Sequence, residues 1–336
     1  MQNEEISKDK LLADCRLCPR DCRINRTIGQ TGVCGQTAQI KAARAALHMW
    51  EEPCISGKNG SGTVFFSGCA LHCVFCQNQN IANSTAGKVI STDRLAEIFL
   101  ELQAQHANNI NLVTPSQFVP QIIHAIELAR ANGLFLPIVY NTSSYETVET
   151  LRMLDGYVDV YLPDLKYKDS IRSQKYSHAS DYFSVASAAI AEMVKQTGEP
   201  QFVPENLIDA KGEWKNAQRL NTEEYQEHSI HHDGDGIMVK GTIVRHLLLP
   251  GGVDDSKEVI KYLIETYGAS IFVSLMSQYT PLPQVQGYPE LERKVTKKEY
   301  EKLIDYAIDL GLENGFIQEG EAATESFIPE FDNQGI

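Results

Sequence analysis

The stretch Thr63-Val-Phe-Phe-Ser-Gly-Cys-Ala-Leu-His-Cys-Val-Phe-Cys-Gln-Asn78 joins a short apolar run to three closely spaced cysteines. These are Cys69, Cys73 and Cys76, and three thiolates in a C-x₃-C-x₂-C pattern are typical of a cubane iron–sulfur cluster. A closed cluster needs four ligands, and no cysteine follows Cys76. We therefore predict a [4Fe–4S] cluster with one open iron, where chemistry can occur. A zinc site is the alternative, because zinc also uses closely spaced cysteines.

The bulk composition indicates an ordinary folded protein. Its 336 residues are 43% hydrophobic and 22% charged, which is enough to bury a substantial core. Without a long apolar run or an apolar core in the polar start Met1-Gln-Asn-Glu-Glu5, we expect a cytoplasmic protein that makes no membrane contact. In that reducing compartment, eight cysteines indicate metal ligands rather than disulfides. The net charge of −14 argues against a nucleic-acid partner, which requires a basic surface.

Six apolar runs are typical of strands buried on both faces of a parallel sheet. They are Thr63–Ser67, Ile110–Val113, Leu134–Tyr140, Val158–Leu162, Gly241–Leu249 and Ser270–Met276. Helical spacing follows each run, so the chain predicts an α/β fold with right-handed crossovers. Because six units are two short of a closed eight-stranded barrel, we expect an open, partial (β/α)₆ barrel.

Apolar spacing and capping patterns place the six helices. Four are expected around Leu95–Leu102, Ile122–Ala129, Val185–Val194 and Val259–Ile264. The third helix is predicted to start at a capping box, Ser143-Ser-Tyr-Glu146, and the sixth at Thr296-Lys-Lys-Glu299.

Three segments fall outside this alternation. Residues 1–60 form a cysteine-rich N-terminal extension without clear strand–helix alternation, and residues 61–320 form the predicted barrel core. A polar, turn-rich stretch at about 199–240 is predicted to be an insertion before the fifth strand. Residues 321–336 are a C-terminal tail.

Polar residues follow the apolar runs, as the working face of a βα barrel requires. They are Thr114-Pro-Ser-Gln117, Asn141-Thr-Ser-Ser144, Asp164-Leu-Lys166 and Ser277-Gln-Tyr-Thr280. Thr114 and Ser143 have a second interpretation as helix caps, and Asp164 and Lys166 as partners of each other. Arg245 lies within the fifth run, where a guanidinium needs an anion, supplied by a ligand or by a structural ion pair.

The N-terminal extension contains a second set of four cysteines, Cys15, Cys18, Cys22 and Cys34. Four thiolates make a closed site, which suits structural zinc or an auxiliary iron–sulfur cluster. The spacing does not separate these two interpretations. The remaining Cys54 is either an ordinary buried thiol or a substitute fourth ligand.

The histidines have less specific interpretations. His72 is expected to point at solvent, and His246 to pack inside, opposite the arginine of its strand. His228, His231 and His232 lie in the polar insertion without ligand spacing.

Taken together, these motifs resemble those of the pyruvate formate-lyase-activating-enzyme-like group of radical S-adenosylmethionine (SAM) proteins, and within it the set called PflX. The motifs that carry the resemblance are spread over nearly the whole chain. They are Cys15-Arg-Leu-Cys-Pro-Arg-Asp-Cys22, Gly32-Val-Cys-Gly35, Phe66-Ser-Gly-Cys-Ala-Leu-His-Cys-Val-Phe-Cys-Gln-Asn78, Asn111-Leu-Val-Thr-Pro115, Tyr140-Asn-Thr-Ser-Ser-Tyr145, Tyr161-Leu-Pro-Asp-Leu-Lys166, Val244-Arg-His-Leu247 and Ser274-Leu-Met-Ser-Gln-Tyr-Thr-Pro281.

The resemblance implies a [4Fe–4S] cluster on the three cysteines of the opening stretch, with SAM bound to the open iron. It implies reductive cleavage of SAM to a 5′-deoxyadenosyl radical that abstracts hydrogen from a substrate. Phe75, which lies between two of these cysteines, is expected to contact the adenine or else to be simple core. We expect Arg245 to meet the carboxylate of SAM, and Asn141, Ser143 and Thr114 to contact the cofactor as well. Thr114 replaces the Gly-Gly-Glu that contacts the SAM amino group in many relatives.

The leading hypothesis is therefore a radical SAM oxidoreductase, with one specific role as an activase that installs a glycyl radical on a protein partner. The implied electron donor is a flavodoxin or ferredoxin type. A rival enzyme modifies a peptide or a small molecule. The non-catalytic alternative is an iron–sulfur electron carrier or a zinc-stabilised binding protein. Family likeness alone fixes no substrate.

Overall fold

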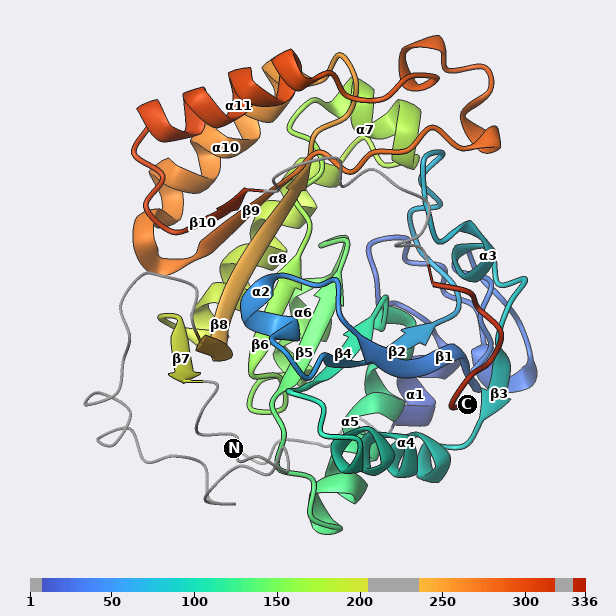
Figure 1. The fold of residues 1–336 in the computed structure, drawn as a ribbon. Helices are drawn as coiled ribbons and strands as arrows, with labels where there is room; N and C mark the ends of the chain where they lie inside the picture. Colours follow the sequence, from blue (N-terminus) through green and yellow to red (C-terminus); the bar gives the residue numbers. More distant parts are fainter. Residues whose placement is uncertain (1–7, 205–235, 318–328) are drawn as a thin grey trace, which may run out of the picture.

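All six predicted strands form, and they lie side by side in one sheet of the computed structural model (Figure 1). The structure describes residues 8–204, 236–317 and 329–336. The six strands are β2 (Ser61–Phe66), β4 (Ile110–Val113), β5 (Ile138–Thr142), β6 (Val160–Pro163), β8 (Gly236–Leu247) and β9 (Phe272–Met276). Each pairs in parallel with the next, in that order, and the sheet does not close on itself. The predicted open, partial barrel is confirmed.

The register brings the carboxyl ends of these strands to the same edge. Ile110 is paired with Gly62 of β2 on one side and with Ile138 of β5 on the other. Ile243 of β8 is paired with Phe272 of β9. The loops that leave β2, β4, β5 and β6 therefore meet above one end of the sheet, where the catalytic face of such folds lies.

Four further strands extend or flank the sheet among the described residues. They are β1 (Ile40–His48), β3 (Lys88–Ile90), β7 (Gln201–Pro204) and β10 (Gly315–Ile317). β1 is antiparallel to both β2 and β3, β7 is antiparallel to β8, and β10 is parallel to β9. The sequence pattern missed β1, so the N-terminal 60 residues add a strand to the same sheet as the predicted core.

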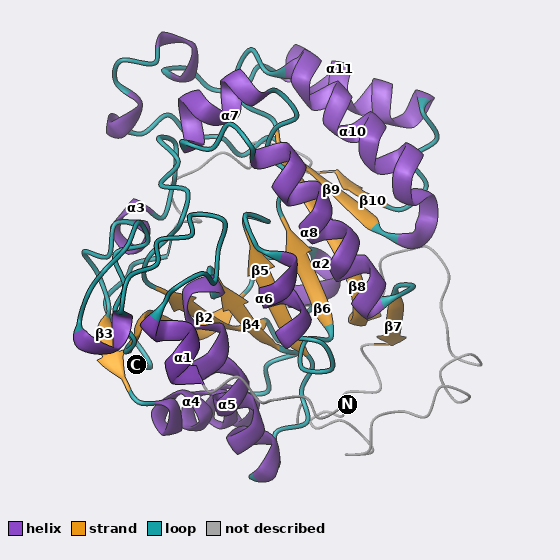
Figure 2. Cartoon of the chain, turned by 180° about the vertical axis from the view of Figure 1, so that it is seen from behind, coloured by secondary structure: helices purple, strands orange, loops and turns teal. Residues whose placement is uncertain are grey.

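The helices that follow the parallel strands are α4 (Thr92–Ala104), α5 (Val119–Ala131), α6 (Val148–Met153), α7 (Ser170–Ser177), α8 (Tyr182–Thr197), α10 (Val253–Tyr267) and α11 (Lys297–Asp309). Most of them cover the outer side of the sheet (Figures 1 and 2). α7 instead lies against the cysteine loop, where the carbonyl of Tyr176 accepts from Val74 N–H. The apolar stripe of α4 shows why a helix covers the sheet: Leu95, Ile98, Phe99 and Leu102 are all buried against it. Each such side chain contributes about 1.5–3 kcal/mol by leaving water.

Short helices occupy the connections. They are α1 (Lys8–Ala13), α2 (Pro53–Ser56) and α3 (Gln79–Ala82), with 3₁₀ turns at Arg26–Ile28, Ser116–Phe118, Gly268–Ser270, Pro283–Val285 and Pro289–Leu291. α2 connects β1 to β2 and, as described below, places acidic side chains at the site.

One capping box is confirmed and the other is wrong. Thr296 and Glu299 form the predicted reciprocal box at the start of α11. The third helix, α6, is instead capped by Thr147, whose side chain accepts from the backbone N–H of Thr150. Strand β5 runs on to Thr142, and Glu146 is buried and accepts hydrogen bonds, so it does not reach back to cap a helix.

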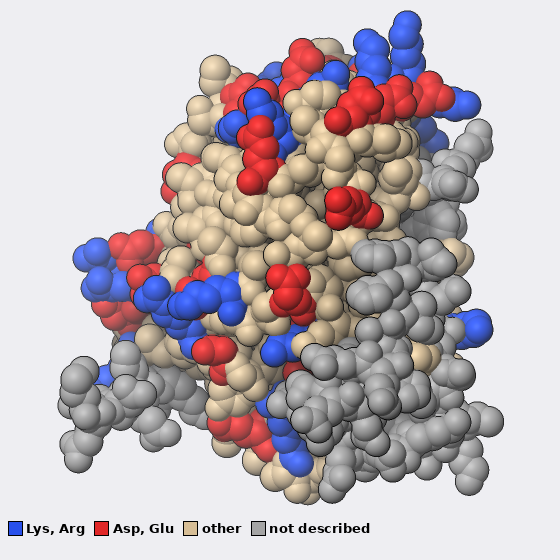
Figure 3. All heavy atoms as spheres, turned by 90° about the vertical axis from the view of Figure 1, so that its left-hand side faces the viewer, with Lys and Arg blue, Asp and Glu red and all other residues tan. Residues whose placement is uncertain are grey.

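The described surface mixes both signs of charge. Figure 3 shows basic and acidic side chains side by side over α10 and α11, where Lys261 lies 3.9 Å from Glu265 and Lys297 3.6 Å from Glu301. No helix in the described residues is both long and apolar enough to span a membrane. The insertion predicted at 199–240 falls mainly on 205–235, outside the described residues, as do His228, His231 and His232.

Candidate functional site

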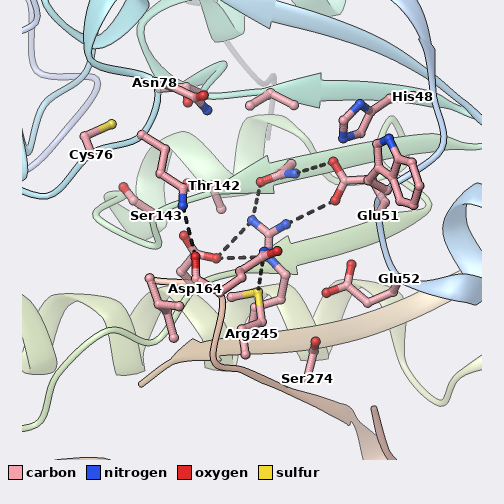
Figure 4. A pocket seen from close by; sticks show the side chains of 18 of the residues that line it. His48, Glu51, Glu52, Cys76, Asn78, Thr142, Ser143, Asp164, Arg245 and Ser274 are labelled. Carbon is pink, nitrogen blue, oxygen red and sulfur yellow. Dashed lines mark hydrogen bonds and ion pairs between the residues drawn. The ribbon is translucent and has the colours of Figure 1, made fainter. Parts of the chain in front are cut away.

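A cavity of about 880 Å³ opens at the carboxyl ends of the parallel strands. Cys69, Cys73 and Cys76 all line it. Figure 4 shows Cys76 on one side of the cavity and Glu51 and Glu52, from the connection that contains α2, on the other. The residues predicted as cofactor contacts are all brought together in its wall: Phe75, Thr114, Asn141, Ser143 and Arg245. Asp164 and Lys166 line it as well.

The three cysteines of the loop are half-buried, and each sulfur has a hydrogen-bond donor. The backbone N–H of Leu71 lies 3.4 Å from Cys69 Sγ, and the Ser177 hydroxyl lies 3.0 Å from Cys73 Sγ. The backbone N–H of Asn78 serves Cys76. Hydrogen bonds to cluster sulfurs tune such sites, so these donors suit a thiolate set that holds iron.

Burial disfavours ionisation of these thiols. It raises the pKa of Cys73 to about 11 and that of Cys76 to about 12, the neighbouring thiols add to both shifts, and Lys166 opposes them only in part. Thiolates bind metals and thiols do not, and iron would supply further positive charge. Among the described residues, no three Cys, His, Asp or Glu side chains converge closely enough to hold a single metal ion. A cubane does not need such convergence, because each thiolate binds a different iron.

An ion network crosses the middle of the cavity (Figure 4). Arg245 donates to Asp164 at 2.9 Å, to Glu51 at 3.2 Å and to Asn141 at 2.6 Å. Lys166 lies 2.6 Å from Asp164. Burial favours the neutral acid at Asp164, but Arg245 and Lys166 outweigh it and lower its pKa. Both interpretations given for Arg245, Asp164 and Lys166 are therefore compatible with their positions: they pair with one another, and they face the cavity.

Thr114 has a strained backbone at the cavity wall. Its φ is 55°, in the left-handed region that a β-branched residue rarely adopts. A backbone hydrogen bond of 3.0 Å to Asn141 and one of 2.8 Å from the Gln117 side chain hold it there. It caps no helix, because the residue before α5 is Phe118, so that alternative is wrong. Strain of this kind clusters at functional sites.

Ser143 and Phe75 both line the cavity, and Phe75 lies within the cysteine loop, between Cys73 and Cys76. Ser143 caps no helix, and its carbonyl accepts from Tyr182 at 2.9 Å, which leaves its side chain in the cavity wall. The Phe75 ring lies between Tyr167 and Tyr279, at 6.4 Å from each ring centre, and is 7% exposed. Its position at the cavity wall is therefore fixed by aromatic packing.

The sequence pattern missed Glu51 and Glu52, which come from the connection between β1 and β2. Glu51 accepts from Asn111 at 3.1 Å and from Arg245, and burial raises its pKa. Glu52 precedes α2, and its side chain does not cap the helix. The one available signal was an acidic pair directly before Pro53 and the buried Cys54. Cys54 is fully buried among apolar residues and is not part of the cavity wall.

The four N-terminal cysteines lie near one another as a second thiol cluster, although no three of them converge on one point where a single metal ion could bind. Burial raises the pKa of Cys18 to about 12, with further contributions from Cys34 and Cys22. Burial likewise raises the pKa of Cys34, to which Cys15 and Cys22 add. Backbone N–H groups donate hydrogen bonds to three of the sulfurs, those of Cys18, Cys22 and Cys34.

This N-terminal cluster packs directly on the cysteine loop of the cavity. Gly68 has φ 93°, and a Cβ there would lie 2.6 Å from the carbonyl oxygen of Cys34, so only glycine allows this approach. Arg20 Nε donates to the carbonyl of Ala70 at 2.8 Å. His72, expected to point at solvent, instead is half-buried and bonds through its ring nitrogens to Val33 and Asn83.

His246 is buried, as expected. Its ring nitrogens bond to the carbonyl of Leu165 at 2.7 Å and to the hydroxyl of Ser256 at 2.8 Å. Burial lowers its pKa to about 4, so the ring is neutral at pH 7 and ties β8 to α10.

Comparisons with known proteins agree with an iron–sulfur loop. Residues 55–181 match a family described as a 4Fe-4S single cluster domain, and this range contains Cys69, Cys73 and Cys76. The chain is similar to the uncharacterized protein MJ0674 of Methanocaldococcus jannaschii, with 26% identity over 312 residues that cover 90% of this chain and 76% of that protein.

Among solved structures, the chain is similar to Streptococcus suis SuiB. The structure of SuiB bound to its precursor peptide SuiA matches with a TM-score of 0.43 and 14% identity, over 75% of this chain and 46% of that chain. The structure of SuiB bound to S-adenosylmethionine matches with a TM-score of 0.44 and 13% identity, over 76% and 49%. The chain thus spans about half the length of the SuiB chains.

Proposed function

We propose that this protein is a radical SAM enzyme, with a [4Fe–4S] cluster held by Cys69, Cys73 and Cys76. The observation that carries the proposal is a loop with three cysteines, within a matched 4Fe-4S domain, that faces a cavity large enough for a cofactor and a substrate. When bound, such a cluster supplies one electron to SAM, whose cleavage gives a 5′-deoxyadenosyl radical that abstracts hydrogen from a substrate.

The chain's own residues would bind and orient SAM in this cavity. Arg245 would bind the carboxylate of SAM, and Asn141, 2.6 Å from the guanidinium, would hold Arg245 in position. Ser143 and the strained Thr114 line the wall between β4 and β5, where a polar amino group needs acceptors. Phe75 would contact the adenine ring, and the surrounding tyrosines would exclude water.

Within this chemistry, we further propose the role of an activase in the pyruvate formate-lyase-activating-enzyme-like group. The substrate would then be a glycyl radical enzyme, and the reductant a flavodoxin or ferredoxin in the cytoplasm. The support is the likeness of motifs from Cys15 to Pro281, and a family likeness carries no substrate by itself.

The test is reductive SAM cleavage by the anaerobically reconstituted protein. With iron, sulfide, SAM and dithionite, we expect 5′-deoxyadenosine to form, and Cys73→Ala to abolish it. Cys54→Ala is the matched control, because Cys54 is buried outside the cavity wall, and this variant should retain the activity. An intact cluster that yields no 5′-deoxyadenosine would favour an electron carrier instead.

A second proposal concerns the N-terminal thiol cluster. We infer that Cys15, Cys18, Cys22 and Cys34 hold a metal, as an auxiliary iron–sulfur cluster or as zinc. Its support is that the four cysteines lie near one another, Cys15 buried and the others half-buried, with backbone N–H donors at three of the sulfurs. Burial raises the pKa of Cys18 and Cys34, and a bound metal would favour their thiolate forms. Metal analysis of a triple alanine variant of the cavity cysteines should still find iron or zinc, and a metal-free variant would contradict the proposal.

A further inference from the structure

The ionisable groups that line the cavity include three acids and two bases among the described residues, namely Glu51, Glu52 and Asp164 against Lys166 and Arg245. Lys166 and Arg245 share Asp164, and Arg245 also pairs with Glu51. Glu52 makes no such ion pair in this part of the chain. Burial raises the pKa of Glu52 and Arg245 offsets that shift only in part, so a further cation would favour its ionised form.

Glu52 is held in the wall with one oxygen unsatisfied. The residue is 8% exposed, the Ser274 hydroxyl bonds to its carboxyl group, and its Oε2 has no hydrogen-bond partner among the described residues. Figure 4 shows Glu52 beside Glu51, across the cavity from Cys76. A buried carboxylate oxygen without a partner is unfavourable, and a cationic donor would satisfy it.

The cavity wall includes apolar side chains that are partly open to solvent. Met49, Trp50 and Ile317 all line the cavity and are 44%, 64% and 39% exposed, and Trp50 lies two residues before Glu52 in the same connection. Exposed apolar side chains in a cavity wall are typical of a ligand-binding surface. An indole ring next to a carboxylate suits a cation on an aliphatic stem, because the ring face attracts the charge and the ring body packs on the methylenes.

We propose that Glu52 binds a cationic group of the substrate, an ammonium or guanidinium carried on an aliphatic stem that packs on Trp50 and Met49. The substrate thus enters with its cation on the side opposite the cysteine loop. Its role as substrate rests on the function proposed above, whereas the binding of the cation does not. The stem then extends across the cavity towards the loop, where hydrogen abstraction would occur.

Binding of propylguanidinium, detected by ligand NMR, tests the proposal. The full chain is used without SAM or reductant, so an enzyme that fails to cleave SAM overturns the proposed function and leaves this measurement standing. We expect wild-type protein to bind propylguanidinium and not the neutral butyramide. Glu52→Gln should weaken binding at least tenfold. Glu258→Gln, an exposed carboxylate on α10 outside the cavity, should bind like the wild type.

The midpoint of thermal unfolding shows whether Glu52 binds a ligand or stabilises the fold. Glu52→Gln removes an unsatisfied carboxylate, so its midpoint should equal or exceed that of the wild type. A clearly lower midpoint, or equal binding by wild type and Glu52→Gln, overturns the proposal.

Two pentapeptides, one with a central arginine and one with norleucine in its place, identify the source of the cation. Binding of the arginine peptide alone assigns the cation to a peptide. Binding of propylguanidinium and of neither peptide assigns it to a small molecule. Both outcomes support the cation site.

Discussion

At the scale of single residues, Glu146 has the most informative environment outside the cavity. Its Oε1 accepts from the hydroxyls of Ser116 and Thr142, both at 2.5 Å, and from Tyr140 at 3.4 Å. Its Oε2 has no partner among the described residues. Burial outweighs these bonds and raises the pKa of Glu146 from 4.5 to about 7. The protonated acid, which can donate a hydrogen bond, therefore persists in the folded protein near neutral pH.

This shift predicts a pH-dependent stability. Because the pKa is higher in the folded protein, the contribution of Glu146 is complete below pH 4.5 and is lost as the pH rises through about 7. Glu146→Gln cannot ionise. Its free energy of unfolding, relative to wild type, should therefore rise by about 3 kcal/mol between about pH 4.5 and about pH 8. Urea unfolding under anaerobic conditions measures both values.

The matched control is Glu149→Gln, which changes an exposed carboxylate in the first turn of the adjacent helix α6. Its difference from wild type should stay constant over the same pH range. If Glu146→Gln and Glu149→Gln respond alike, the folded protein does not raise the pKa of Glu146 and the prediction is wrong.

At the scale of elements, α6 shows where a helix begins. The side chain of Thr147 accepts from Thr150 N–H and caps the helix, whereas Ser143 directly follows the end of β5 at Thr142. Thr147→Ala should therefore lower the free energy of unfolding by about 1 kcal/mol, the usual loss for an N-cap. Ser143→Ala should leave it nearly unchanged. Chemical unfolding of both variants decides, and a larger loss at Ser143 would restore the capping box as the helix start.

The strands that the sequence predicted correctly are those buried on both faces, because a short apolar run without alternation fits a buried strand better than it fits a surface helix or a loop. Strand β1 was missed for a physical reason. Its four alanines, with Lys41 before them and Arg44 among them, favour no strand by themselves. The strand forms because β2 and β3 pair with it on either side.

The same distinction applies to the candidate site. Residues that directly follow buried strands, such as Asn141 and Asp164, could be predicted to meet, because the topology fixes where strand ends lie. Glu51 and Glu52 could not, since their place in the cavity depends on how one connection folds over the sheet. The close approach of the N-terminal thiol cluster to the cysteine loop at Gly68 also depends on tertiary packing, and no local sequence pattern predicts it.

At the scale of the whole molecule, the N-terminal segment supports the cavity from outside. Arg20 connects three parts of the chain that are far apart in sequence. Its guanidinium donates to the carbonyls of Ala70 and His178, at 2.8 and 2.7 Å, and lies 5.1 Å from the ring centre of Tyr145. The cysteine loop is thus held by a segment that carries its own thiol cluster. Loss of structure in either region should therefore destabilise the other.

Removal of this connection should make a bound cluster easier to lose. Arg20→Ala deletes three charge-assisted hydrogen bonds, to the carbonyls of Ala70, Ser177 and His178. The local loss is about 1.5 kcal/mol or more, so the loop should open about tenfold more often. Iron release from the reconstituted protein to a chelator should accelerate by the same factor. The loss of cluster absorbance over time measures this rate. Arg16→Ala is the matched control, because Arg16 pairs with Asp14 on the exposed side of the same segment and touches no part of the loop in the described contacts. Equal release rates for the two variants would mean that the cysteine loop is held by the barrel alone.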